Sequence, residues 1–157
     1  MKTHLLCTLL FASGAIFAQQ DRTSELNMRG DHEMGFSHEK TTHHFELNLD
    51  GGIIEVRAND VKDMVSRDQI RMHFQHMAQM FASGNFNVPM LVHARPDVPG
   101  TAEMASLKDQ LHWDLQNTPR GARLIITADN KPALTAVHEF LRFQIADHQT
   151  GDCTMVR

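Results

Sequence analysis

The chain has 157 residues, of which 41% are hydrophobic, and a formal net charge of −4 with neutral histidines. This length is sufficient for one domain with a core that needs no disulfide or metal ion. The acidic balance argues against a nucleic-acid-binding protein, which requires a clustered basic surface. The 11 histidines and 10 methionines are the unusual feature, and in an exported protein such a composition favours copper binding.

Residues 1–18 have the pattern of a cleaved secretory signal peptide. A basic residue precedes an apolar run from Leu5 to Phe17, and the small residue Ala18 follows. The run is too short to be a permanent anchor, and no later segment is apolar enough to span a bilayer. We therefore expect a periplasmic or secreted protein without stable membrane insertion. Cys153 would be its single cysteine, so no internal disulfide is expected.

The domain itself is expected over residues 43–152. The preceding segment, 19–42, is polar and shows no sustained hydrophobic period, which predicts a flexible leader. Residues 153–157 are expected to form a short tail.

Residues 43–59 predict a β-hairpin. Apolar and polar residues alternate on both sides of Asp50-Gly51-Gly52, whose glycines suit a tight turn. The alternation places His43 on the apolar face of the first strand and His44 on the polar face. A buried histidine needs a hydrogen-bond partner or a metal ion. His43 is therefore either a hydrogen-bonded core residue or a ligand.

Residues 66–84 predict the longest helix, with an aspartate cap before it and a glycine at its end. An apolar stripe follows from the helical rotation of about 100° per residue, and it consists of Ile70, Phe74, Met77 and Phe81. A second row beside this stripe consists of His73, His76 and Met80. These side chains are donors for soft metal ions at positions i, i+3 and i+7.

The second half of the chain predicts a similar set of elements. A short strand is expected around residues 89–93, where prolines favour an edge position. Residues 101–108 predict a short helix, and 111–128 predict a second hairpin with Trp113 on its apolar face. A proline in the first turn opens a final helix, whose apolar stripe ends at His148.

The two halves resemble each other as hairpin–helix units over 43–84 and 109–149. Matching the segment at His44 with that at His112 gives a separation of 68 residues, and the helices match at 71. Each unit has one apolar sheet face and one apolar helix stripe to bury. We therefore expect an α+β two-layer sandwich built from two ββα units. It would have an antiparallel sheet of four or five strands, with two long helices on one face.

In this alignment, the donor row belongs to the first unit alone. His43, His73 and His76 would correspond to Leu111, Gln144 and Asp147. This difference indicates that the first half has been specialised, although drift after a duplication would give the same pattern.

The donor row predicts a metal site between the first hairpin and the first long helix. Its seven candidate ligands are His43, His44, His73, His76, Met80, Met90 and His93. A mixture of imidazole and thioether favours copper over zinc. Non-covalent haem is an alternative, since histidine and methionine are its common axial ligands and no C-x-x-C-H motif is present. The same histidines could otherwise be boundary residues of an ordinary core.

An enzyme is not expected, because G-x-S-x-G, H-E-x-x-H and P-loop patterns are missing from the sequence. The alternative to metal binding is a binding or interaction module for another ligand. Phe140 and Phe143 lie off the main stripe of the last helix and could cover a partner in a homodimer.

Three passages, MGFSHEKTTHHFEL, DQIRMHFQHMAQMF and HEFLRFQIADHQTGD, resemble a group of small exported bacterial proteins of uncharacterised function. The resemblance covers most of residues 33–152, and members of this group are often labelled aspartate carbamoyltransferase. A Ser-Thr-Arg-Thr phosphate loop and a His-Pro-x-Gln segment, expected of a transcarbamoylase, do not occur here. The resemblance therefore implies the fold, and it supplies no catalytic residue.

Overall fold

The structure is a computed structural model that describes the backbone of residues 12–157 and the side chains of residues 21–157. The expected signal peptide falls mostly outside this range. Residues 1–11 lie outside the described residues, and residues 12–18 form the start of the first helix. None of the described helices is long and apolar enough to cross a bilayer.

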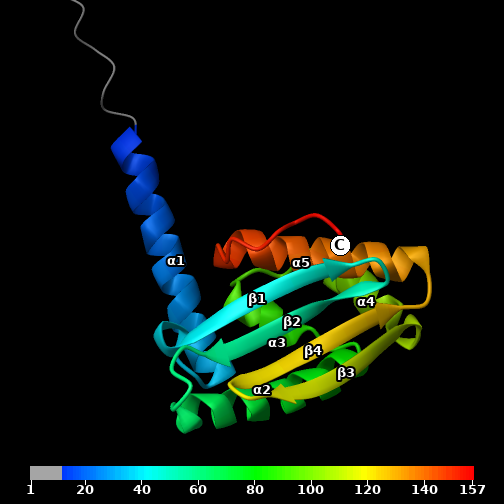
Figure 1. Cartoon of the computed structure of the whole chain (residues 1–157). Helices are drawn as coiled ribbons and strands as arrows, with labels where there is room; N and C mark the ends of the chain where they lie inside the picture. The colour runs from blue at the N-terminus through cyan, green and yellow to red at the C-terminus, as the bar shows by residue number, and fades with distance from the viewer. Residues whose placement is uncertain (1–11) are drawn as a thin grey trace, which may run out of the picture.

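The chain alternates helical segments with two β-hairpins (Figure 1). In chain order, the elements are α1 (Ala12–Met34), the 3-10 turn η1 (His38–Lys40), β1 (Thr41–Asn48), β2 (Gly51–Ala58), α2 (Met64–Ala82), α3 (Asn87–Val92), α4 (Thr101–Ser106), the 3-10 turn η2 (Lys108–Gln110), β3 (Leu111–Thr118), β4 (Gly121–Ala128) and α5 (Lys131–His148).

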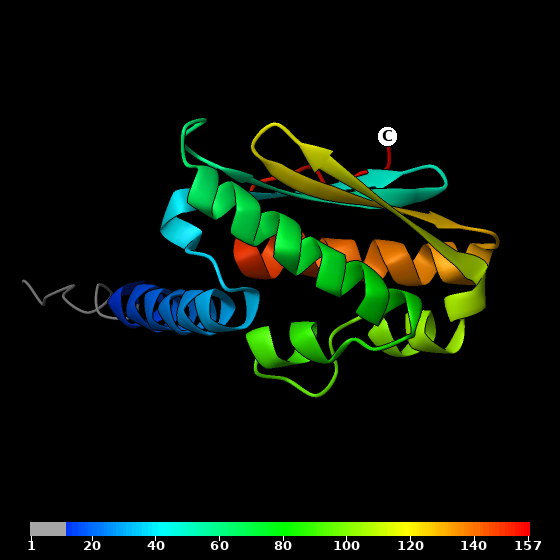
Figure 2. The ribbon, with the colours of Figure 1, turned by 90° about the horizontal axis from the view of Figure 1, so that it is seen from below.

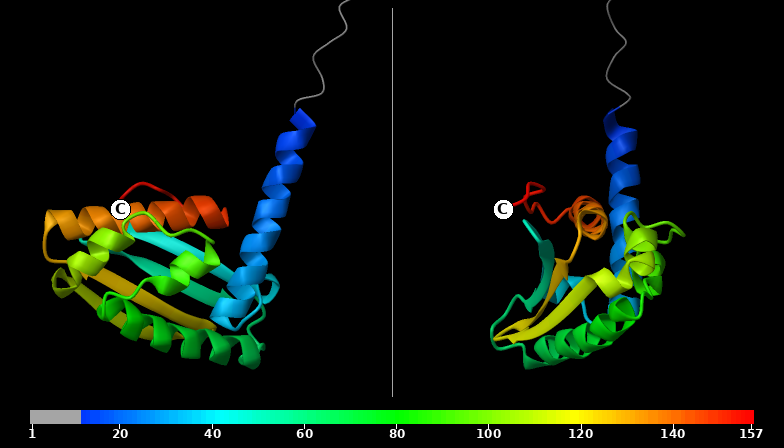
Figure 3. Two further views of the ribbon diagram at one scale, coloured as in Figure 1. Left: turned by 180° about the vertical axis from the view of Figure 1, so that it is seen from behind. Right: turned by 90° about the vertical axis from the view of Figure 1, so that its right-hand side faces the viewer.

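The four strands form one antiparallel sheet in the order β1-β2-β4-β3. Equivalent hydrogen bonds tie each hairpin turn to the other hairpin: the Ala58 N–H donates to the Arg120 carbonyl (2.8 Å), and the Ala128 N–H donates to the Asp50 carbonyl (2.9 Å). Figure 3 shows α2 and α5 on the same side of this sheet. The predicted α+β sandwich with an antiparallel sheet is confirmed.

The two hairpins correspond at a different separation from the predicted one. β1 and β3 begin 70 residues apart, so His43 corresponds to Trp113 and not to Leu111. The helices begin after the N-cap residues Asp63 and Asn130, which are 67 residues apart. The matches of residue type at 68 and 71 differ from these separations because turns and caps determine where the strands and helices begin.

The helices α2 and α5 each pack mainly on the hairpin of the other half of the chain. α2 lies over β3 and β4, and α5 lies over β1 and β2 (Figure 2). Gly52 allows the close approach of α5, since a Cβ atom at this position would lie 2.2 Å from Cδ1 of Leu141. The predicted interior between the first hairpin and the first helix is therefore bounded by α5 as well.

The helix caps follow the sequence. The Asp63 carboxylate accepts from the Ser66 N–H at the start of α2 (2.9 Å), and this hydrogen bond lowers the pKa of the Asp63 carboxyl. Gly84, with φ of 81°, follows the end of α2. All four residues of the predicted stripe are buried, namely Ile70, Phe74, Met77 and Phe81.

Two predicted segments take another conformation. Residues 19–34 belong to α1 and are not a flexible leader, because Leu26, Gly30 and Met34 recur every four residues and give the helix one packing face. Leu26 is buried, and Arg29 Nε donates to the Val92 carbonyl (3.0 Å).

The predicted strand at 89–93 lies instead largely in α3. The Asn85 side chain accepts from the Asn87 N–H (3.0 Å) and turns the chain. Pro89 then lies in the first turn of the short helix, where its missing N–H costs no hydrogen bond.

The predicted tail lies along the edge strand β1. The Arg157 N–H donates to the Leu47 carbonyl (2.9 Å), and Arg142 Nε donates to the Thr154 carbonyl (3.2 Å). Covering a free strand edge in this way reduces pairing with other chains.

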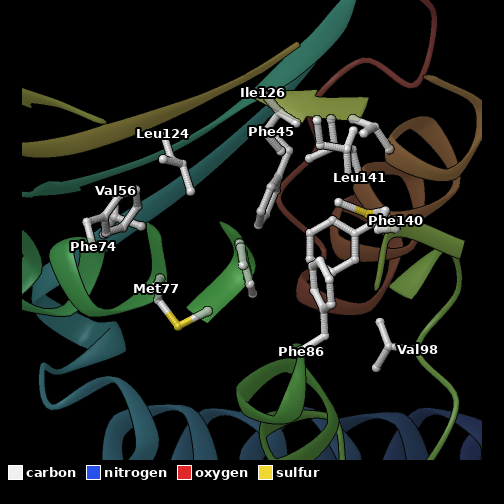
Figure 4. Packing of buried hydrophobic residues seen from close by; sticks show 14 of the residues in the cluster. Phe45, Val56, Phe74, Met77, Phe86, Val98, Leu124, Ile126, Phe140 and Leu141 are labelled. Carbon is white, nitrogen blue, oxygen red and sulfur yellow. The ribbon is translucent and has the colours of Figure 1, made fainter. Parts of the chain in front are cut away.

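The layer between sheet and helices is filled by aromatic and aliphatic side chains. Figure 4 shows Phe86 and Phe140 against each other, and their ring centroids are 6.3 Å apart. Phe140 is 2% exposed, which corrects its predicted place at a dimer surface. α4 covers this side of α5, and Phe143 packs on His93 with 4.8 Å between the ring centroids.

Candidate ligand-binding cavity

A cavity of about 80 Å³ lies in the same layer, where β1, α2, α3 and α5 meet near the end of α1. Most of its wall is apolar, and Phe45, Val56, Phe74 and Leu124 belong to it (Figure 4). Its polar wall residues are His43, His73, His93, Gln144 and His148. No described Lys, Arg, Asp, Glu, Ser, Thr or Cys lines it. The cavity is therefore an apolar site whose polarity comes from imidazoles and one amide.

His43 points into the cavity from β1, as the strand alternation predicted. Its ring lies parallel to that of His148, with 5.5 Å between centroids and 7° between planes. The Nε2 atom is buried without a hydrogen-bond partner. Burial lowers the pKa of His43 to about 4, and the neighbouring His44 adds to this shift. The ring is therefore uncharged at neutral pH.

His73 reaches the cavity from α2. Its ring meets Phe36 edge to face, with 5.6 Å between centroids and 83° between planes. Burial lowers the pKa of His73 to about 4, with smaller contributions from His43 and His76. This imidazole is also uncharged at neutral pH.

His148 completes the group from the last turn of α5. Its ring meets His93 edge to face at 5.0 Å, and burial lowers its pKa to about 3. His148 was not among the predicted ligands. Its position on the apolar stripe of the last helix was the available indication, but that helix was assigned to the other half of the molecule.

No hydrogen bond joins the rings of His43, His73 and His148 to any other residue that the structure describes. Buried polar groups are normally paired, and leaving one unpaired costs about 1–3 kcal/mol. Among these three rings, Nε2 of His43 is such a buried atom without a partner, whereas the rings of His73 and His148 are partly buried. A ligand that hydrogen-bonds to Nε2 of His43 would remove this cost.

His93, by contrast, is fully occupied. Its Nδ1 lies 2.6 Å from Oδ2 of Asp147, and its Nε2 lies 3.1 Å from Oε1 of Gln144. Because a carboxylate only accepts, Nδ1 of His93 donates to it. Asp147 also pairs with Arg22 of α1. Burial alone would raise the pKa of the Asp147 carboxyl, but the His93 hydrogen bond and the Arg22 charge hold it below its ordinary value.

Gln144 contributes a further unpaired polar atom. Its Nε2 is buried without a partner while its Oε1 faces the His93 ring. If His93 is neutral, its Nε2 accepts, and the amide turns over to donate to it. Either orientation leaves one polar atom of the buried amide without a protein partner.

Three of the seven predicted ligands, His43, His73 and His93, line the cavity. The others do not. His44 lies on the outer sheet face, where its Nδ1 is 3.1 Å from Oδ1 of Asp152, and His76 is exposed.

Met80 and Met90 are partly buried and are not part of the cavity wall. The predicted donor row divides because His76 lies about 120° from Ile70 around the helix, whereas His73 lies about 60° away. Among the described residues, no group of three or more His, Cys, Asp and Glu is arranged to hold a metal ion.

Comparison of the chain with family models, with curated proteins and with solved structures gives no match.

Proposed function

We propose that this protein binds a small uncharged ligand in the cavity, through His43, His73 and His148. One observation supports the proposal: three partly buried imidazoles from β1, α2 and α5 line one cavity, no described residue hydrogen-bonds to them, and Nε2 of His43 is fully buried. Each neutral ring offers one donor and one acceptor. A ligand with complementary groups would recover the hydrogen bonds that the fold leaves unmade.

The charge of the cavity supports an uncharged ligand. Its three unpaired histidines have pKa values of about 4, 4 and 3, and no described charged residue lines the wall. A charged ligand would lose its hydration without gaining a counter-charge, which is costly in an apolar site.

The size of the cavity limits the ligand further. An engineered cavity of about 150 Å³ in another protein holds benzene, whereas this one measures about 80 Å³. By the same ratio, a molecule of roughly three or four non-hydrogen atoms would fit without displacing side chains. Haem is therefore not part of the proposal.

Copper binding is the second candidate. The observation that favours it is that three unprotonated imidazoles share a cavity with the thioether of Met34, since Cu(I) prefers these ligands. The rings would have to turn before their nitrogen atoms could share one ion. With the export that residues 1–18 predict, the function would be copper handling outside the cytoplasm.

We propose binding without turnover, since no described Ser, Thr, Cys or Lys lines the cavity as a nucleophile.

The test of ligand charge uses three probes of nearly equal shape: acetamide, acetate and acetamidinium. Their affinities are measured at pH 7 by ligand-observed NMR on the wild type and on His73→Leu. We expect acetamide to bind most tightly and to lose most of its affinity in the variant. Tighter binding of acetate, or no effect of the substitution, would contradict the proposal.

The test of metal binding uses Cu(I), Cu(II) and Zn(II) titrations of the same two proteins. Stoichiometric Cu(I) binding that disappears in His73→Leu, with a shift of the Met34 methyl resonance, would select copper over the uncharged ligand. Metal binding that survives in His73→Leu would lie outside the cavity.

A further inference from the structure

A groove of about 300 Å³ lies next to the cavity, between α1, β1 and the end of α5. Met34, His43 and His148 line both the groove and the cavity. These three side chains therefore form the partition between the two spaces. Because the partition contains two of the three unpaired histidines, a ligand at these rings lies beside the groove.

We infer that the groove is a second subsite of the same ligand, which is an elongated uncharged molecule. Its apolar end fills the cavity, and its hydrogen-bonding end meets His43 and His148 at the partition and extends into the groove. This inference rests on the proposed function. It assigns the ligand to uncharged amphipathic molecules, such as alkyl amides and alcohols.

The groove differs from the cavity in its polar groups. Its polar wall residues other than the shared histidines are Asn27, His38, Thr41, Thr42, Gln149 and Thr150. These are amides, hydroxyls and one imidazole, and no described Lys, Arg, Asp or Glu lines the groove. The groove therefore suits an uncharged hydrogen-bonding group better than an ion.

Most polar groups of the groove are already used within the protein. Thr41 Oγ1 donates to the Ser37 carbonyl (2.8 Å), and Thr42 Oγ1 donates to Asn59 Oδ1 (2.5 Å). The Asn27 carboxamide makes no hydrogen bond with any described residue. Asn27 therefore has both a donor and an acceptor available to the polar end of the ligand.

Met34 is the side chain that would move to join the two spaces. It is unbranched and flexible, it ends α1, and Gly35 with φ of 75° follows it. The stacked rings of His43 and His148 are held by β1 and α5 and form the fixed part of the partition. Side-chain rotation of Met34 requires no change in the backbone.

The experiment compares hexanamide with acetamide by NMR titration at pH 7. The proteins are the wild type, Asn27→Leu and the control Asn117→Leu, an exposed residue of β3. We expect hexanamide to bind the wild type roughly tenfold more tightly than acetamide, because its chain reaches both spaces. Asn27→Leu should weaken hexanamide binding roughly three- to tenfold and leave acetamide unchanged. Asn117→Leu should change neither affinity.

A second measurement does not depend on a variant. Intermolecular nuclear Overhauser effects should join the alkyl end of hexanamide to Phe36 and its amide end to Asn27. If both probes bind equally well and Asn27→Leu has no effect, or if the amide end contacts Phe36, the groove is not a subsite while the cavity proposal stands. If neither probe perturbs His43, His73 or His148, both proposals are wrong.

Discussion

The two edge strands hold equivalent places in the sheet but face different interiors. Trp113 on β3 packs against Phe81 and Phe86, with ring centroids 5.2 and 6.4 Å away. His43 holds the equivalent place on β1 and faces a second histidine and a cavity. The same backbone thus accommodates an aromatic cluster around Trp113 and an imidazole group around His43, with Phe81 shared by the cluster and the cavity wall. Each group contains a buried nitrogen without a partner, Nε1 of Trp113 and Nε2 of His43. The equivalent strand does without histidines, and this difference supports the proposed site.

Acidification should affect the imidazole group most strongly. The folded-state pKa values of His43, His73 and His148 are about 4, 4 and 3, below the ordinary value of about 6.5. Protonation therefore favours the unfolded chain. The stabilisation is complete above about pH 6.5 and is lost as the pH falls towards 4 to 3. We expect a loss of roughly 2 kcal/mol per histidine between pH 7 and pH 5.

Urea denaturation at pH 7 and pH 5 measures this loss of unfolding free energy. The carboxyls of Asp147 and Asp152, whose pKa values are lowered, add their effect at lower pH. His43→Leu with His148→Leu should flatten the pH dependence, and His112→Ala on the outer sheet face should not. An equally steep dependence in the double variant would show that other groups are responsible.

The aromatic cluster should respond most to a loss of volume. Phe86 is 3% exposed and stacks on Phe81 at 4.7 Å between centroids. We expect Phe86→Ala to lower the unfolding free energy by about 3–5 kcal/mol, as measured in urea at pH 7. The His43 and His148 resonances should keep their positions, since Phe86 does not line the cavity. A loss below about 1 kcal/mol would mean that this cluster is not solidly packed.

Substitution of the two neighbouring histidines on β1 should affect the unfolding free energy differently. His43→Leu removes a buried polar atom without a partner, and we expect the unfolding free energy to stay equal or to rise by about 1 kcal/mol. His44→Leu removes the hydrogen bond to Asp152, and we expect a loss of about 1 kcal/mol. Paired denaturation curves at pH 7 test this, and a loss in both variants would show that His43 has a partner.

The smallest effect is expected at His76. Its side chain is exposed on α2 and does not line the cavity. His76→Ala should change the unfolding free energy by less than about 0.5 kcal/mol and leave acetamide affinity unchanged in the titration. Loss of binding in this variant would restore the helix row that the sequence predicted.

Local patterns predicted most of the scaffold. The stripe of α2, the cap at Asp63 and the inward direction of His43 all follow from helical and strand periodicity, which depends on adjacent residues. The predicted strand at residues 89–93 was wrong. The preference of proline for an edge strand suggested it, but the Asn85 side chain turns the chain and starts a short helix.

The composition of the site was harder to predict than the scaffold. His148 lies beside His43 because α5 packs on the first hairpin. This packing joins segments far apart in the sequence, so local hydrophobic periodicity does not predict it. The sequence suggested a histidine group, and three of its predicted members do meet. The fourth histidine, His148, and the lack of hydrogen bonds at His43, His73 and His148 are visible only in the folded chain.

Binding of an uncharged ligand at the three histidines is best measured by a long-range ¹H–¹⁵N correlation spectrum of the histidine rings at pH 7, recorded with and without acetamide. We predict neutral-ring ¹⁵N shifts for His43, His73 and His148, and movement of all three resonances on addition of acetamide. The resonances of His44 and His112 should stay in place. Rings that are charged at pH 7, or acetamide-induced movement confined to His44 and His112, would contradict the proposed site.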